Sequence, residues 1–106
     1  MGYLECGEGM RPIILKLARD DLKDIHTRLS EYGMNPPVKF RESFERFCSQ
    51  VEKMPYLYSQ YDQNPVYRRA VLTYDYLVFY KVESTSRVKI YRVLYGKRDI
   101  LPMLDE

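Results

Sequence analysis

The chain of 106 residues has few of the side chains that metal centres and cofactor sites use. It contains no tryptophan, one histidine (His26) and two cysteines, Cys6 and Cys48. One histidine and two distant cysteines do not have the spacing of a recognised zinc site, so we expect no metal and no cofactor. Cys48 lies beside Phe44 and Phe47 in a helical pattern, which predicts that it packs as a small apolar side chain.

Long apolar runs are also absent, since no stretch approaches the roughly 18 residues that a membrane-spanning helix needs. The first ten residues, MGYLECGEGM, lack the basic and apolar regions of a secretory signal. These absences favour a cytoplasmic protein without membrane contact, in which a disulfide between Cys6 and Cys48 is not expected. The length fits one domain, which we expect over residues 10–106.

Residues 1–9 are predicted to be a flexible extension. The stretch GEG precedes Met10 and is encodable by purine-rich codons that resemble a bacterial ribosome-binding site. We therefore hypothesise that Met10 is the native start. The alternative is that the extension is genuine.

Charge is spread unevenly although the net charge is only +2. Residues 66–99 contain eight Lys or Arg and three Asp or Glu, which gives this segment a net charge of +5. Such asymmetry indicates an anionic partner, either a polynucleotide or an acidic protein. A solvated sheet edge protected by cations is the alternative interpretation.

Two helices are predicted in the first half of the chain. In the first, the apolar positions Leu22, Ile25, Leu29 and Tyr32 recur every three or four residues, after a β-rich stretch over residues 11–18. Asp20 and Asp21 are expected in the first turn of this helix, where its dipole favours anions, and Gly33 is expected to end it. His26 lies off the centre of the stripe and is expected to be a partly exposed helix residue rather than a general base.

The second helix is predicted over residues 35–54, with Asn35 as a cap and Pro36 and Pro37 in its first turn. The apolar positions expected to face inward are Phe40, Phe44, Phe47, Val51 and Met54. The short loop between the helices predicts an antiparallel helical hairpin.

Three strands are expected to follow, at residues 66–72, 76–82 and 87–95. A turn is expected near Tyr74 and Asp75, and a polar hairpin turn over residues 83–86. The resulting order, β-α-α-β-β-β, predicts an α+β fold in which the helix pair packs on one face of an antiparallel meander.

Arg92 is a charged residue at a position of a strand that is expected to face the core. By strict alternation it shares a face with Ile90 and Leu94, so it needs a partner, a bulge or an exit to solvent. Arg68 and Arg69 lie on the first strand of the meander. We expect these cations to converge on one concave surface; the alternative is that the long stems of Arg68 and Arg92 reach the sheet edge separately.

Three short motifs resemble the RelE/ParE superfamily of bacterial toxins, known from type II toxin–antitoxin systems, plasmid stabilisation and addiction modules. They are MPYLY (54–58), YRRAVLTYDYLVFYKV (67–82) and RVLYGKRD (92–99), which occur in the family's order after the helical hairpin. The match runs from Arg11 to Leu101 and implies the RelE/ParE-like form of the predicted fold.

RelE-like members cleave messenger RNA on the ribosome with a cluster of cations and a tyrosine. The resemblance places Arg68 and Arg98 at two positions of that cluster, but Ala70, Leu77 and Leu104 stand where two cations and the tyrosine belong. Loss of three participants implies loss of most ribonuclease activity, because cations stabilise the charge that develops on the phosphate.

ParE-like members act on DNA gyrase by binding, and the short C-terminus and the PYLY stretch resemble this side of the superfamily. Tyr95 stands where a histidine is usual, and tyrosine is not a base near neutral pH. If the chain is an enzyme, the candidate catalytic residues are Arg68, Arg92, Tyr95 and Arg98. The residues expected to bind the target or an antitoxin are Arg68, Arg69, Arg92, Lys97 and Arg98.

The resemblance implies an acidic antitoxin partner, with DNA contacted only through that antitoxin. Three functions stay open: a toxin of DNA gyrase, a ribosome-dependent messenger endonuclease, and a non-toxic module that binds an antitoxin as a co-repressor. The first is the prediction from the sequence, and the other two are its alternatives.

Overall fold

The computed structural model describes residues 11–84, 87–97, 100 and 104. Its elements in chain order are β1 (Ile13–Ile14), α1 (Lys16–Ser30), α2 (Asn35–Lys53), β2 (Arg68–Val71), a tight turn (Thr73–Asp75), β3 (Tyr76–Ser84) and β4 (Arg87–Tyr95). The proposed extension 1–9 lies outside the described residues.

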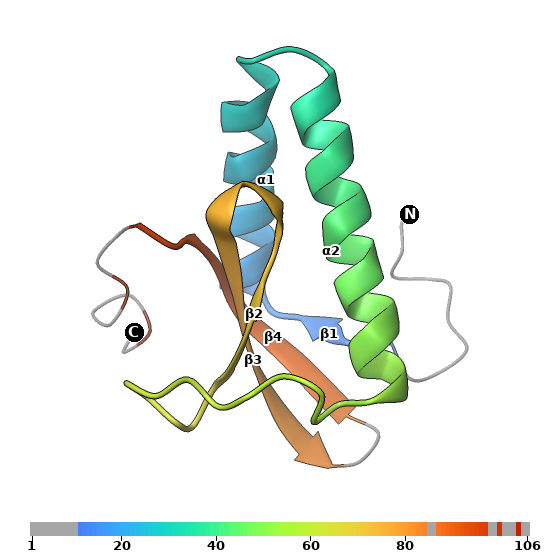
Figure 1. The fold of residues 1–106 in the computed structure, drawn as a ribbon, viewed down its shortest axis with the longest axis vertical. Helices are drawn as coiled ribbons and strands as arrows, with labels where there is room; N and C mark the ends of the chain where they lie inside the picture. The colour runs from blue at the N-terminus through green and yellow to red at the C-terminus, as the bar shows by residue number, and fades with distance from the viewer. Residues whose placement is uncertain (1–10, 85–86, 98–99, 101–103, 105–106) are drawn as a thin grey trace.

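A mixed sheet of four strands forms one layer, in the order β1-β4-β3-β2. β2, β3 and β4 pair antiparallel as the predicted meander, and β1 pairs parallel with β4. The helical hairpin covers one face of this sheet, and its tip extends beyond the strands (Figure 1). The α+β fold predicted from the element order is confirmed.

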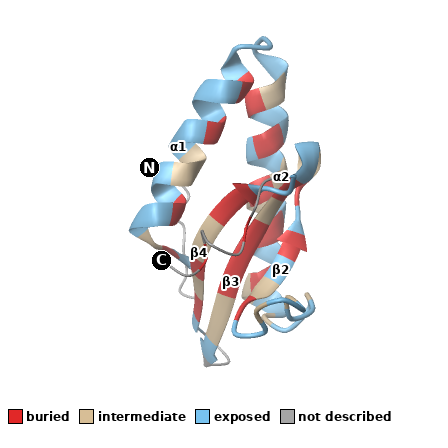
Figure 2. Cartoon of the chain, turned by 90° about the vertical axis from the view of Figure 1, so that its left-hand side faces the viewer, coloured by how far each residue is buried: buried red, intermediate tan, exposed pale blue. Residues whose placement is uncertain are grey.

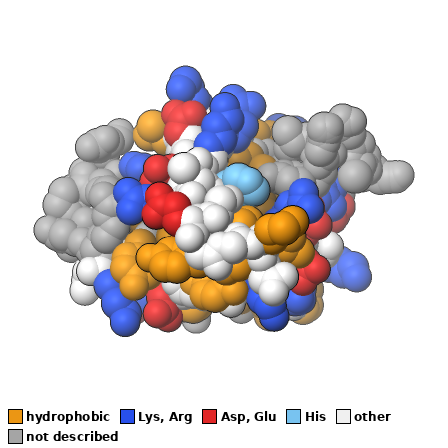
Figure 3. All heavy atoms as spheres, turned by 90° about the horizontal axis from the view of Figure 1, so that it is seen from above, with side chains coloured by type: hydrophobic (Ala, Val, Ile, Leu, Met, Phe, Trp, Pro, Cys, Tyr) orange, Lys and Arg blue, Asp and Glu red, His pale blue; other side chains and the backbone are white. Residues whose placement is uncertain are grey.

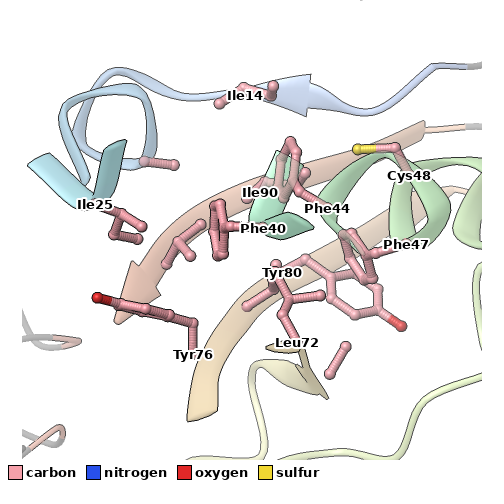
Figure 4. Packing of buried hydrophobic residues seen from close by; sticks show 14 of the residues in the cluster. Ile14, Ile25, Phe40, Phe44, Phe47, Cys48, Leu72, Tyr76, Tyr80 and Ile90 are labelled. Atoms are coloured by element: carbon pink, nitrogen blue, oxygen red, sulfur yellow. The ribbon is translucent and has the colours of Figure 1, made fainter. Parts of the chain in front are cut away.

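The main core lies between the hairpin and the sheet. On α2, the predicted inward residues Phe40, Phe44, Phe47 and Val51 are all buried. The ring of Phe47 packs edge-on against Tyr80 of β3 with centroids 5.5 Å apart (Figure 4). Burial of this aromatic stripe is the main favourable term that holds α2 on the sheet.

Cys48 belongs to this core, as the sequence predicts, and is a free thiol. Burial raises its pKa from 9.0 to about 12. The same cause raises the pKa of Tyr80 to about 12, and the Tyr80 hydroxyl donates a hydrogen bond to the carbonyl of Pro55. Both groups are therefore neutral at physiological pH.

The inward stripes end sooner than the sequence predicts. Met54 is 53% exposed, so its predicted inward position is wrong, and Tyr32, the last residue of the stripe in the first predicted helix, is 77% exposed. The reason is that α1 ends at Ser30 and α2 at Lys53, and the helical period no longer turns the next side chains toward the sheet. His26 is exposed on α1, at the surface seen from the hairpin end (Figure 3).

The first strand is much shorter than the predicted residues 11–18. After Ile14, the Leu15 N–H donates to the carbonyl of Ile90, and α1 starts at Lys16. The early start turns Ala18 into the core, where it is fully buried. Asp20 and Asp21 consequently fall outside the first turn of α1, which contains no acidic residue, so the predicted dipole role is wrong.

A second, smaller cluster covers the sheet face that is turned away from the helices. Its buried members are Tyr67, Phe79, Leu94, Ile100 and Leu104. The helices thus cover one side of the sheet and the second cluster lies on the other, and exposed and half-buried residues alternate with buried ones on its strands (Figure 2). None of the described helices is long and apolar enough to cross a membrane.

Candidate functional site

Arg92 has a partner that lies far away in the sequence. Its Nε donates to Oδ2 of Asp21 at 2.8 Å, and its terminal nitrogen donates to Oδ1 at 3.0 Å. The same Oδ2 accepts the backbone N–H of Val93 at 2.9 Å. Both charged side chains are only 14% exposed, so this is a shielded two-bond ion pair that joins α1 to β4.

The position of Asp21 follows from the short first strand. β1 covers the edge of β4 at Lys89 and Ile90 only. Beyond that point the outer N–H groups of β4 need other acceptors, and the Asp21 carboxylate serves Val93 in place of a strand. The conflict around Arg92 is thus resolved by a partner on the helix.

A β-bulge at Tyr91 changes which face of the sheet the following side chains of β4 lie on. Phe79 lies opposite Arg92 and Tyr80 lies opposite Ile90, so Tyr91 is the extra residue. Ile90 packs in the main core, whereas Leu94 packs in the second cluster. The expectation that Ile90 and Leu94 share a face is wrong, because strict alternation does not continue through a bulge.

An open pocket of about 720 Å³ lies beside the ion pair. Its walls come from α1, the start of α2, the tight turn before β3 and the end of β4. Four tyrosines line it: Tyr32, Tyr74, Tyr76 and Tyr95. We call this site the tyrosine pocket. Seen from the hairpin end, apolar side chains gather on the surface between charged ones (Figure 3).

The turn that carries Tyr74 has an unfavourable backbone. Tyr74 and Asp75 have φ values of 61° and 65°, the only non-glycine positive values among the described residues. Side chains with a Cβ adopt this region at a cost, and such strain is often found at binding sites. The strain is retained here because the turn is fastened to the end of β4.

The attachment of the turn to the end of β4 depends on Gly96. Its N–H donates to the Asp75 carbonyl at 2.7 Å. A Cβ at Gly96 would lie 2.9 Å from the same carbonyl oxygen, which is too close. Tyr76 and Tyr95 add a ring contact with centroids 5.5 Å apart, so the turn and the strand end form one wall of the tyrosine pocket.

The charges that line the tyrosine pocket are paired. Besides Asp21 with Arg92, Arg28 donates to Asp24 at 2.9 Å. Asp75 lies 3.9 Å from Lys97, which is mostly exposed. Burial raises the pKa of Tyr76 and the nearby Arg28 guanidinium opposes that shift, so this hydroxyl stays protonated at neutral pH.

Three of the predicted site residues lie at or beside the tyrosine pocket, and Arg68 and Arg69 lie elsewhere. Arg92 and Tyr95 line the tyrosine pocket, and Lys97 contacts its turn. Arg68 is on β2, where it donates to the Tyr58 carbonyl at 2.7 Å and stacks on the Tyr56 ring at 4.9 Å.

Arg69 is exposed and lies over Tyr61 at 5.8 Å. Arg98 lies outside the described residues. Arg68 and Arg69 thus contact the connection that precedes β2, whereas Arg92 contacts α1, so these contacts do not bring the three arginines together.

Sequence reasoning missed two components of the site, the acceptor role of Asp21 and the tyrosine lining. Arg92 gave the signal for the first, since it required a partner, but nothing local in the sequence points to a residue on α1. Among the described residues, no three His, Cys, Asp or Glu side chains are close enough to hold a metal ion.

Comparison with known proteins identifies the family. Residues 13–100 match the model of the ParE toxin of type II toxin–antitoxin systems, parDE. A solved chain from the chromosomal ParDE toxin–antitoxin system of P. aeruginosa has a similar fold, with a TM-score of 0.59 and 16% sequence identity, over 83% of this chain and 97% of that chain. No curated protein is similar enough to count as a match. Since the family model covers most of its length, the chain belongs to the ParE toxin family of type II toxin–antitoxin systems.

Proposed function

We propose that the chain is a toxin that inhibits DNA gyrase by binding it, and that a cognate antitoxin neutralises it. ParE-like toxins act on gyrase, and the family match supports that target over a ribosomal one. The proposal treats the tyrosine pocket and its rim as the contact surface for the target.

The observation that carries the proposal is the pairing of the cations. A phosphate-cleaving site needs cations that are free to neutralise developing negative charge. Arg92 is instead bound by two hydrogen bonds to Asp21, and Arg68 is held by a carbonyl and an aromatic ring. Neither arginine is presented to a phosphate by these contacts, which supports binding over RNA cleavage.

The composition of the tyrosine pocket supports a protein target. Tyrosines and arginines are enriched at the energetic centres of protein interfaces, because they combine large contact area with a polar tip. Tyr74 is 39% exposed and Tyr95 is 37% exposed, so part of each ring is available while the remainder is anchored in the wall. Tyr32 adds a third exposed ring at the hairpin tip.

Two assays on the purified chain test the proposal in parallel. The first measures supercoiling of relaxed plasmid by gyrase as the chain is added. The second measures messenger cleavage by primer extension in a translation extract. We expect inhibition of supercoiling with intact messenger; cleaved messenger with normal supercoiling would instead assign the chain to the RelE-like activity.

Single variants locate the contact surface. Tyr74→Ala and Tyr95→Ala are expected to weaken gyrase inhibition about tenfold or more, the effect of losing an interface anchor. Tyr56→Ala is the matched control, because Tyr56 is 54% exposed and does not line the tyrosine pocket. Equal inhibition by all three variants would remove the tyrosine pocket from the proposal.

A further inference from the structure

The sheet face turned away from the helices carries a row of side chains that the tyrosine pocket does not use. Ile13 of β1 lies opposite Lys89 of β4, and Lys89 lies opposite Lys81 of β3. Residues paired across neighbouring strands have side chains on the same face. Arg69 of β2 lies opposite Phe79, a member of the second cluster, and so shares that face. We call Ile13, Arg69, Lys81 and Lys89 the basic sheet patch.

Two lysines directly opposite each other are unfavourable. Like charges on paired residues repel, and neighbouring groups reduce the cost only in part. Lys89 reaches the carboxylate of Glu83 at 3.3 Å. Among the described residues, no carboxylate pairs with Lys81, which lies instead over the rings of Tyr67 and Tyr91, at 5.0 and 4.6 Å.

The rings hold Lys81 in place without removing its charge. A cation over a tyrosine face is attracted by the ring but stays ionised. Lys81 and Lys89 are half-buried, so these two cations are partly ordered before any partner binds, whereas Arg69 is exposed. Exposed and half-buried residues continue to the lower ends of β3 and β4 (Figure 2). Positive charge fixed in this way costs less entropy to engage than charge on free side chains.

We infer that the basic sheet patch binds an acidic peptide segment of a partner protein. Carboxylates placed above Lys81 and Lys89 relieve their repulsion, and the contact of Lys89 with Glu83 shows that a carboxylate on this face already pairs with one of the two lysines. Ile13, which is 36% exposed at the end of the row, offers an apolar contact beside the cations. The patch therefore fits a segment in which acidic and apolar residues are mixed.

A polynucleotide fits the patch less well. Proteins that bind single strands offer free aromatic faces on which bases stack. Here Tyr67 is 8% exposed, and both Tyr67 and Tyr91 are covered by Lys81. The net charge of the whole chain is only +2, which gives little of the long-range attraction that polynucleotide binding needs.

The inference rests on the proposed antitoxin only for the source of the peptide. It also separates two surfaces: the tyrosine pocket for the target and the basic sheet patch for the neutralising partner. A change in the patch should therefore alter peptide binding and leave gyrase inhibition unchanged.

Fluorescence anisotropy with the purified full chain tests the inference. The probe is a fluorescein-labelled peptide of glutamate and leucine; the comparison probes are the same peptide with lysine in place of glutamate, and a labelled oligothymidylate. We expect binding of the acidic peptide alone. The double variant Lys81→Gln, Lys89→Gln should weaken it about tenfold, since two charge-assisted contacts are lost.

Two further double variants keep the result interpretable. Lys81→Arg with Lys89→Arg retains both charges and should bind almost as well as the unmodified chain. Lys23→Gln with Lys53→Gln removes the same net charge from exposed positions on the helices and should have less than about a twofold effect. Circular dichroism and urea unfolding verify that each variant is folded.

Three results would overturn the inference: no binding of the acidic peptide, equal weakening by the two glutamine pairs, or tighter binding of the oligothymidylate. Gyrase inhibition by the Lys81→Gln, Lys89→Gln variant is measured on the same preparation. If that inhibition is absent in the unmodified chain too, the target assignment fails while the peptide result still stands by itself.

Discussion

The Asp21 carboxylate holds the Arg92 guanidinium by two hydrogen bonds of 2.8 and 3.0 Å, between residues 71 positions apart in the sequence. The pair joins the second turn of α1 to the edge of β4, and the same carboxylate accepts the Val93 N–H. One acidic side chain therefore fixes a helix, neutralises a cation and completes a sheet edge.

Removal of this carboxylate should be costly. Asp21→Ala removes the carboxylate that accepts hydrogen bonds from the largely shielded Arg92 guanidinium and from the Val93 N–H, and we expect a loss of about 2 to 3 kcal/mol in the free energy of unfolding. Urea denaturation followed by circular dichroism measures it. Asp20→Ala is the control on the same helix, because Asp20 pairs with Lys16 in solvent and should show little effect.

Arg92→Ala should cost less than Asp21→Ala, since the carboxylate keeps its bond to Val93. A double-mutant cycle with Asp21→Asn and Arg92→Gln isolates the coupling between the two side chains. If the two changes are simply additive, the ion pair contributes nothing beyond its separate parts, and the proposed fastening of α1 is wrong.

A substitution at Tyr74 in the strained turn should affect the free energy of unfolding and the inhibition of gyrase differently. Tyr74→Gly removes the side chain at φ 61°, and glycine adopts this region freely, so the free energy of unfolding should rise or stay constant. The same variant loses an exposed ring of the tyrosine pocket and should inhibit gyrase less. Higher stability with undiminished inhibition would show that the strain has no role in target binding.

Two glycines should be intolerant for different reasons. Gly96→Ala brings a Cβ to 2.9 Å from the Asp75 carbonyl oxygen, so the turn must move. Gly33→Ala meets no atom within 4 Å, but its φ of 117° strains any residue with a Cβ. We expect each change to lower the free energy of unfolding by about 1 to 2 kcal/mol.

Gyrase inhibition distinguishes these two glycine variants. Gly96→Ala should reduce it more, because Gly96 attaches the turn that carries Tyr74 to β4, whereas Gly33 does not itself line the tyrosine pocket. Equal inhibition by both variants would argue that the wall does not contribute to binding.

Alkaline pH should destabilise the fold. The pKa values of Cys48 and Tyr80 are raised to about 12 by burial, from 9.0 and 10.0. Above pH 9 the unfolded chain loses these protons before the folded chain does, so the free energy of unfolding decreases as pH rises toward 12. Urea unfolding at a series of pH values measures the decrease, and Cys48→Ala should remove its first part.

The sequence determined the order of the elements and much of the core by local pattern. β4 has the predicted bounds, and the stripe of Phe40, Phe44, Phe47 and Val51 is buried, because period and composition report which side chains avoid water. The helical hairpin, the meander and the family motifs follow from the same local information, and the family assignment is confirmed by the match over residues 13–100.

Only the tertiary structure decided what the charged residues contact. The bulge at Tyr91 separates Ile90 from Leu94, and the early end of β1 places Asp21 beside Arg92. Both results depend on pairing between distant segments. One added or missing residue there moves every later side chain of the strand to the other face of the sheet. Periodicity contains no information on that register, so the sequence predicted only that Arg92 needed a partner, and the fold shows that this partner is Asp21.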